Sequence, residues 1–153
     1  TIFPTTKRTK KGYGDGMRER MMYNRDRVIG TFAERIKATE AAERVLLKME
    51  HSGYFTGIDL DSFRTTILAF LREPVGNLMG MCSYSRNHRN AKNPGERTWR
   101  ILLDRNLLYR NDGELEATIY HEFLHGILGP KEGHGEMFQQ YEQLWPQING
   151  VDV

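Results

Sequence analysis

The sequence predicts an α+β domain, with helices in both halves of the chain and a small sheet between them. Residues 17–51 and 114–128 repeat their apolar residues at the spacing of an amphipathic helix. Residues 76–85 and 99–104 are short apolar segments bounded by glycine, proline and polar residues, as is typical of strands. The chain has 153 residues, 39% of them hydrophobic and 27% charged, which suits one domain with its own core.

The N-terminal segment, residues 1–16, is polar, basic and rich in glycine, and we expect a flexible arm there. Residues 1–27 hold eight Lys and Arg against three acidic residues, a balance of +5, so the rest of the chain carries −3. A second basic cluster lies in residues 86–100. Clustered positive charge favours a polyanionic partner, so the arm and the 86–100 loop are candidate contacts for nucleic acid. A solvated tail explains the arm equally well.

The first long helical segment spans residues 17–51, where alanine and charged residues separate the apolar positions. Thr31 and Glu34 match a capping box that would restart the helix after a break at Gly30. Gly53 is a suitable C-terminal stop.

A further helix is expected before Pro74, which cannot continue a helix. Either Asp61 or Ser62 is a suitable N-cap. The apolar residues that follow recur at near-helical intervals (Phe63, Ile67, Phe70 and Leu71).

The two strand segments, 76–85 and 99–104, are separated by a polar loop, and an antiparallel hairpin is the simplest arrangement. The predicted sheet is therefore small and mainly antiparallel. Gly80 indicates a bulge or a close approach of another part of the chain. Cys82, the only cysteine, is expected to be buried in the first strand, and it excludes a disulfide within this chain.

In the C-terminal part, Asp112 is a plausible cap for the helix at residues 114–128, which ends at Gly129. A last helix is expected to begin at or near His134 and to be closed by Pro146.

The expected domain organisation is a basic arm at residues 1–16, one domain at 17–147 and a loose tail at 148–153. The N-terminal residues lack the apolar region of a secretory signal, and no apolar run approaches the ~20 residues of a membrane span. With a single cysteine, these observations predict a protein of the cytoplasm or another reducing intracellular compartment, with no membrane partner.

Residues 121–125 read His-Glu-Phe-Leu-His, the H-E-x-x-H pattern of zinc-dependent peptidases. Residues four apart lie on one face of a helix, so His121 and His125 can bind one metal ion. Glu122 lies beside them, in position to act on water rather than to bind the metal. Closed structural zinc sites usually use cysteines and four ligands, so the pattern favours a catalytic zinc.

A third ligand must come from elsewhere in the chain, because catalytic zinc typically has three protein ligands. His134 is favoured, since the glycines on either side of it let an imidazole be aimed from a tight turn. Three carboxylates are the alternatives (Glu132, Glu136 and Glu142).

The order of these segments resembles that of the SprT-like metallopeptidases, which include the Spartan proteases. The resemblance covers about residues 63–145 and is strongest at 117–138, where a third histidine is followed by glycine and then an aromatic residue. It implies a zincin-like fold in which two C-terminal helices hold the metal. It also implies that His121, His125 and His134 bind Zn²⁺ and that Glu122 is the general base. The segments that match are residues 80–84, 101–103, 121–125 and 133–138.

Two features differ from related families. Leu128 and Lys131 occupy the places where the metzincin pattern has glycine and histidine, so that group is disfavoured. Many SprT-like proteins carry a four-cysteine zinc ribbon, which this chain lacks.

The predicted function is therefore a zinc-dependent endopeptidase, and the resemblance implies DNA-associated proteins as substrates. The alternative is a nucleic-acid-associated or assembly protein that keeps the fold with vestigial peptidase activity.

Overall fold

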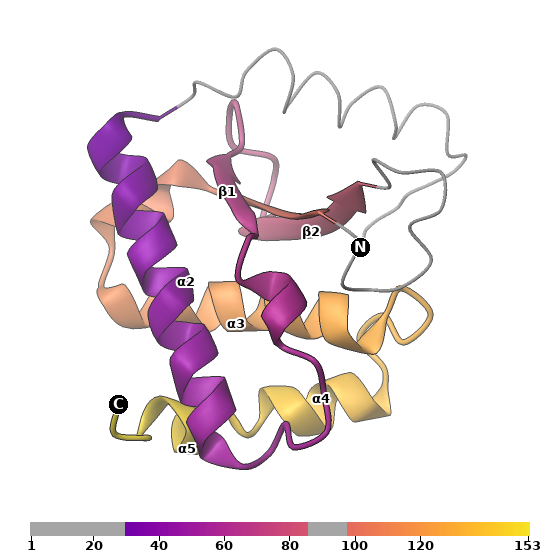
Figure 1. The fold of residues 1–153 in the computed structure, drawn as a ribbon. Coiled ribbons are helices and arrows are strands. Elements are labelled where there is room, and N and C mark those ends of the chain that lie inside the picture. The colour runs from indigo at the N-terminus through magenta and orange to yellow at the C-terminus, as the bar shows by residue number, and fades with distance from the viewer. Residues whose placement is uncertain (1–29, 86–97) are drawn as a thin grey trace.

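The computed structural model describes residues 30–85 and 98–153, which form the predicted α+β fold. Figure 1 shows three tiers: a three-stranded sheet at the top, helix α3 (Asp112–Leu128) across the middle, and helices α4 (Glu136–Glu142) and α5 (Trp145–Asn149) at the bottom. Helix α2 (Phe32–Ser52) crosses the tiers and contacts the sheet, α3 and α5. Helix α3 is thereby packed between the sheet and α4.

Helix α2 begins and ends as its sequence predicts. The Thr31 hydroxyl accepts a hydrogen bond from the Glu34 N–H, and the Glu34 carboxylate accepts one from the Thr31 N–H, which completes the capping box. Gly53 ends the helix with a left-handed φ of 84°. Residues 17–29, the expected first part of this helix, lie outside the described residues. The buried face of α2 is mostly apolar (Ala38, Ala41, Ala42, Val45, Leu46 and Met49).

The helix expected before Pro74 is wrong, because Ile67–Phe70 forms strand β1 and only Asp61–Phe63 forms a single 3₁₀ turn, η2. The apolar run at residues 67–71 is continuous, and a short run of this kind is compatible with either structure. Both faces of β1 are covered: Leu68 and Phe70 join the main core, whereas Ala69 packs in a second cluster with Leu102. A strand buried on both faces has no need of polar alternation.

The predicted hairpin is confirmed. Strand β2 (Gly80–Ser85) pairs antiparallel with β3 (Thr98–Leu103), with Gly80 opposite Leu103. Strand β1 pairs parallel with the other edge of β3, so the sheet order is β1-β3-β2 and the sheet is mixed rather than mainly antiparallel. Cys82 is buried in β2, as expected.

After β3 the chain makes a 3₁₀ segment, η4 (Arg105–Tyr109), and enters α3. The N-cap of α3 is Asn111 and not Asp112. Asn111 has the extended backbone of an N-cap, and its side-chain oxygen accepts a hydrogen bond from the Glu114 N–H at 3.0 Å. The predicted stop at Gly129 is confirmed.

The prediction that Pro146 closes the last helix is wrong. Helix α4 ends at Glu142, and Pro146 lies in the first turn of α5, where proline costs little because the N–H it lacks would have no helical partner. Ile148 of α5 is completely buried. The packed part of the chain therefore continues into residues that the sequence suggested were loose.

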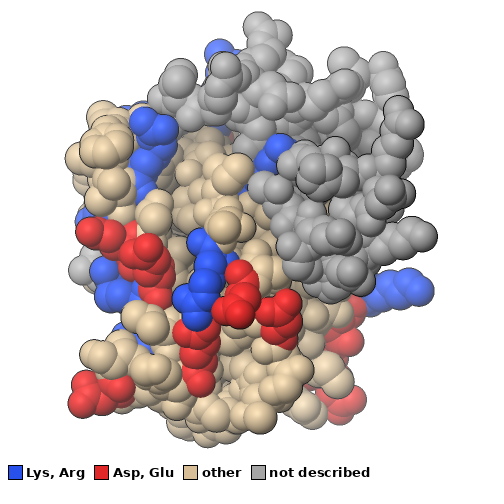
Figure 2. All heavy atoms as spheres, viewed as in Figure 1, with Lys and Arg blue, Asp and Glu red and all other residues tan. Residues whose placement is uncertain are grey.

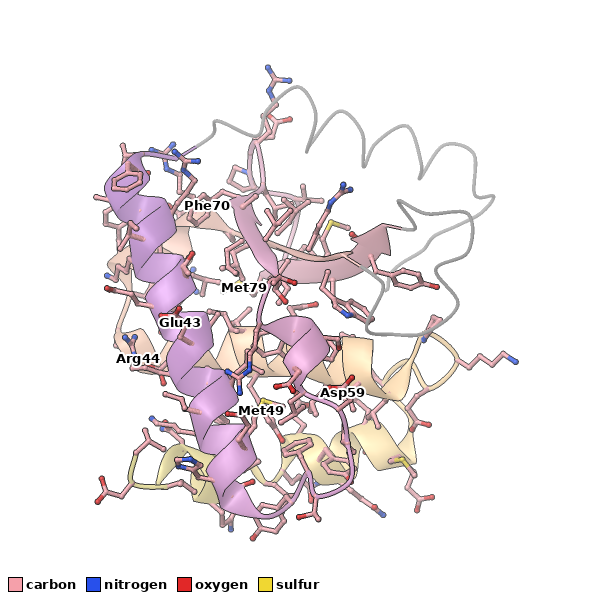
Figure 3. All side chains as sticks on the ribbon, in the orientation of Figure 1. Glu43, Arg44, Met49, Asp59, Phe70 and Met79 are labelled. Atoms are coloured by element: carbon pink, nitrogen blue, oxygen red, sulfur yellow. The ribbon has the colours of Figure 1, made fainter. Side chains whose placement is uncertain are left out.

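The core extends along the length of α2 and joins it to the sheet and to α3. Figure 3 shows Phe70 of β1 beside the N-terminal half of α2 and Met49 near the other end of that helix. Phe70, Met49 and Phe123 of α3 belong to the same buried cluster. Among the described residues, none of the helices has the length and apolar character needed to cross a bilayer.

Candidate metal centre

Helix α3 presents His121 and His125 on one face, one turn apart, and buries another face in the core. Leu115, Ile119 and Leu124 are at most 1% exposed and hold the helix in the core. The two histidines are only half-buried and face α4. The amphipathic packing of α3 thus decides which way both imidazoles point.

The turn after α3 brings His134 back to these two histidines. Gly129 and Gly133 adopt positive φ angles of 88° and 55°, which let the chain reverse within a few residues. The Nε2 atom of His134 then lies 3.1 Å from Nε2 of His125 and 3.3 Å from Nε2 of His121. One nitrogen of each imidazole therefore converges on a single point.

The spacing of these nitrogens fits a tetrahedral zinc ion. Two nitrogens that each lie ~2.0–2.1 Å from such an ion are ~3.3 Å apart, close to the separations found here. The three residues form a group whose ligand atoms all lie within 4.8 Å of one another. A set of three imidazoles is typical of catalytic zinc sites, whereas structural sites usually have four ligands.

Two of the histidines are held in the neutral form that binds metals. Burial, together with the neighbouring His121, lowers the pKa of His125 to about 2. Burial and His121 also lower the pKa of His134. A neutral imidazole needs to lose no proton before it binds a metal, so these shifts favour metal binding at neutral pH.

Phe138 of α4 supports all three imidazoles. Its ring stacks on His125 with centroids 4.5 Å apart and meets His121 and His134 edge-on at 4.8 and 5.0 Å. Phe138 is completely buried, so its position is fixed by the core. The sequence marks this residue as an apolar position of the last helix and, in the resemblance, as the aromatic residue after the third histidine. Its contact with the whole cluster is visible only in the fold.

The three glutamates considered as alternatives to His134 lie outside the histidine cluster. Glu132 accepts hydrogen bonds from the N–H groups of Met137 at 2.9 Å and Phe138 at 3.2 Å, so it caps the start of α4. Glu142 contacts Nδ1 of His121, and Glu136 is exposed in the first turn of α4. The geometry therefore groups His134, and none of these glutamates, with the two histidines of α3.

Glu122 follows His121 on α3, and its buried side chain lies against strand β2. Glu122 is only 4% exposed. This burial, with a contribution from Glu142, raises the pKa of Glu122 to about 8. A Cβ added to Gly80 would lie 3.2 Å from Oε2 of Glu122 and 3.1 Å from the Leu102 carbonyl oxygen. The close approach expected at Gly80 is thus present, and it makes room for this carboxyl group.

The predicted nucleic-acid contacts lie mostly outside the described residues, which begin at Gly30 and omit 86–97. On the face seen in Figure 2, basic side chains of the described residues lie next to acidic ones. Arg64, for example, pairs with Glu50 and with Asp61. Glu50 and Asp61 also line a hollow in the surface that holds none of the predicted site residues.

Comparisons with protein-family models, curated protein sequences and solved structures returned no match.

Proposed function

We propose that this protein is a zinc-dependent endopeptidase of the SprT-like type, with a zincin-like fold. The observation that supports this most directly is the convergence of the Nε2 atoms of His121, His125 and His134, two of which lie on the same helix as the buried Glu122. Zinc, when bound by these three histidines, supplies a Lewis acid that activates water and polarises the carbonyl of a peptide bond.

Glu122 is the general base in this proposal. A carboxylate can accept a proton from the attacking water and return it to the leaving amine. Burial raises the pKa of Glu122 to about 8, and the positive charge of a bound zinc ion would lower it again and so favour the ionised form that a base needs. The carboxyl group lies against Gly80 of strand β2, where the absence of a side chain leaves room for it, so β2 helps to position the base. The helix that carries Glu122 also carries two of the histidines, which sets the distance between the base and the metal ligands.

The substrate class follows from the resemblance alone. A SprT-like peptidase would act on proteins associated with DNA, and the basic residues 1–16 and 86–100 are the segments that would contact the DNA. Cleavage should therefore be measured both with free protein and with protein bound to DNA.

The test measures zinc content and cleavage of an unstructured protein substrate, such as casein, by the wild-type chain and by Glu122→Gln. We expect one zinc per chain in both proteins and cleavage only by the wild type, since the substitution removes the base and keeps the ligands. The matched control is Glu136→Gln, an exposed glutamate on α4, which should cleave as the wild type does.

Two results would contradict the proposal. A wild-type chain that takes up no zinc would remove the metal site, and equal cleavage by wild type and Glu122→Gln would remove the assigned base. Zinc uptake without cleavage of free or DNA-bound protein would favour the alternative of a binding or assembly protein that keeps the fold.

A further inference from the structure

The carboxylate of Glu142 contacts the nitrogen of His121 that faces away from the histidine cluster. Nε2 of His121 lies 3.3 Å from Nε2 of His134, whereas Nδ1 of the same ring is paired with Oε2 of Glu142. The two nitrogens of one imidazole therefore have separate partners, on opposite sides of the ring.

We propose that Glu142 is a positioning residue for the metal site: it accepts a hydrogen bond from Nδ1–H of His121 and so leaves Nε2 as the nitrogen that binds metal. This inference rests on the proposed zinc site. A carboxylate has no proton to donate, so the single ring proton of a neutral His121 must lie on Nδ1 for the pair to form. The lone pair on Nε2 is then directed toward His125 and His134.

The same contact explains why Glu142 is not the third ligand. The oxygen that meets Nδ1 lies on the far side of the imidazole from Nε2, so it is directed away from the point where the three Nε2 atoms converge. A histidine ligand commonly donates its second N–H to a carboxylate, which fixes the ring orientation and increases the basicity of the ligating nitrogen.

Contacts at both ends of α4 hold Glu142 next to His121. At its N-terminus, Glu132 caps the helix. At its C-terminus, the Tyr120 hydroxyl donates a hydrogen bond of 2.6 Å to the carbonyl oxygen of Tyr141, the residue before Glu142. The ring of Tyr141 stacks on Phe55 at 5.2 Å. The backbone that carries Glu142 is therefore attached to α3, the helix that carries His121.

The carboxylate itself is accessible to water. The side chain of Glu142 is 46% exposed and that of His121 is 29% exposed. Water screens the charge of an exposed group, so the effect of Glu142 should come from the direction and proton position of the His121 ring rather than from its negative charge. An uncharged hydrogen-bond acceptor should therefore be able to replace the carboxylate.

The experiment measures zinc affinity by competition with a chromophoric chelator. Glu142→Ala should bind zinc about 10- to 100-fold more weakly than the wild type, as is usual when a carboxylate behind a histidine ligand is removed. Glu142→Gln keeps an acceptor oxygen and should recover most of the affinity. Glu136→Ala removes the same group from an exposed place on the same helix and should bind zinc like the wild type.

A second measurement needs no metal. In the zinc-free protein, ¹⁵N NMR of His121 should show the proton on Nδ1 in the wild type and on both nitrogens, in exchange, in Glu142→Ala. Thermal unfolding of the zinc-free variants identifies any general loss of folding, which would lower the unfolding midpoint of Glu142→Ala before metal is added.

The outcomes separate this inference from the proposed function. Equal zinc affinity of Glu142→Ala and wild type, or an unchanged position of the His121 proton, would overturn the role of Glu142 and leave the zinc site intact. A wild-type chain that binds no zinc would instead overturn the zinc site, whatever the variants show, and the NMR measurement would still decide whether Glu142 orients His121.

Discussion

Replacing Gly80 with alanine should impair the proposed base without removing a metal ligand. The added methyl group would lie 3.1 Å from the Leu102 carbonyl oxygen, which is fixed in β3, and 3.2 Å from Oε2 of Glu122. Because the strand backbone cannot easily move, the Glu122 side chain has to shift by a few tenths of an ångström. A displacement of ~1 Å can cost ~100-fold in rate, so we expect a loss of about tenfold in kcat.

The assay compares peptide hydrolysis, zinc affinity and unfolding by urea for the same proteins. Gly80→Ala should bind zinc within about twofold of the wild type and lose about 1–3 kcal/mol of stability, the usual cost of an overpacked position. The matched control is Gly150→Ala, where a new Cβ makes only ordinary contacts at 3.5 Å and φ is −81°.

Hydrolysis by Gly80→Ala at the wild-type rate would refute the reasoning that β2 directs Glu122. A parallel loss of zinc and of activity would also refute it, because the substitution would then act on the ligands and not on the base.

Phe138→Ala should lower the free energy of unfolding by about 3–5 kcal/mol, the usual cost of truncating a buried phenylalanine. The same substitution should weaken zinc binding. A variant as stable as the wild type would contradict the packing described for Phe138. Arg105, Tyr109 and the Thr31 N–H lower the pKa of Glu34 from 4.5 to about 2, so the stability that this carboxylate contributes should be complete above pH 4.5 and should disappear as the pH falls toward 2. Urea midpoints measured against pH should therefore fall less steeply between 4.5 and 2 for Glu34→Gln, and identical slopes would argue against the pairing. Deleting residues 1–16 should reduce the salt dependence of DNA binding, measured as the slope of log affinity against log salt, whereas an unchanged slope would exclude the arm as a contact.

The helices with clear end signals could be predicted from the sequence. Thr31 and Glu34 are three residues apart and form a local capping box, so nothing distant was needed to place the start of α2. Strand β1 could not be predicted in the same way, because its hydrogen-bonding partner β3 lies some thirty residues further along the chain. The apolar run at residues 67–71 suits a helix or a strand, and pairing with β3 decides between them.

The site divides in a similar manner. His121 and His125 follow from the geometry of one helix, which the sequence determines directly. The position of His134 depends on the turn that follows α3. The glycines of this turn, Gly129 and Gly133, could be recognised in the sequence, but the direction in which the turn runs could not. The contact between Glu142 and His121 joins residues 21 positions apart. It depends on how α4 packs against α3, and no local pattern encodes that packing.

Because the cluster is divided between α3 and the turn that leads into α4, a bound metal would also affect stability. Helix α4 has seven residues, too few for a helix to be stable by itself in water. An ion bound by His125 on one helix and His134 on the connecting turn would act as a cross-link that closes a short loop, as a disulfide does in other small proteins. Because Cys82 is the only cysteine, this chain has no disulfide of its own with which to make such a link. The same ion would then stabilise the packing of α4 against α3. Loss of zinc would therefore loosen α4 together with its Phe138 and Glu142 side chains, which contact the histidines of the site.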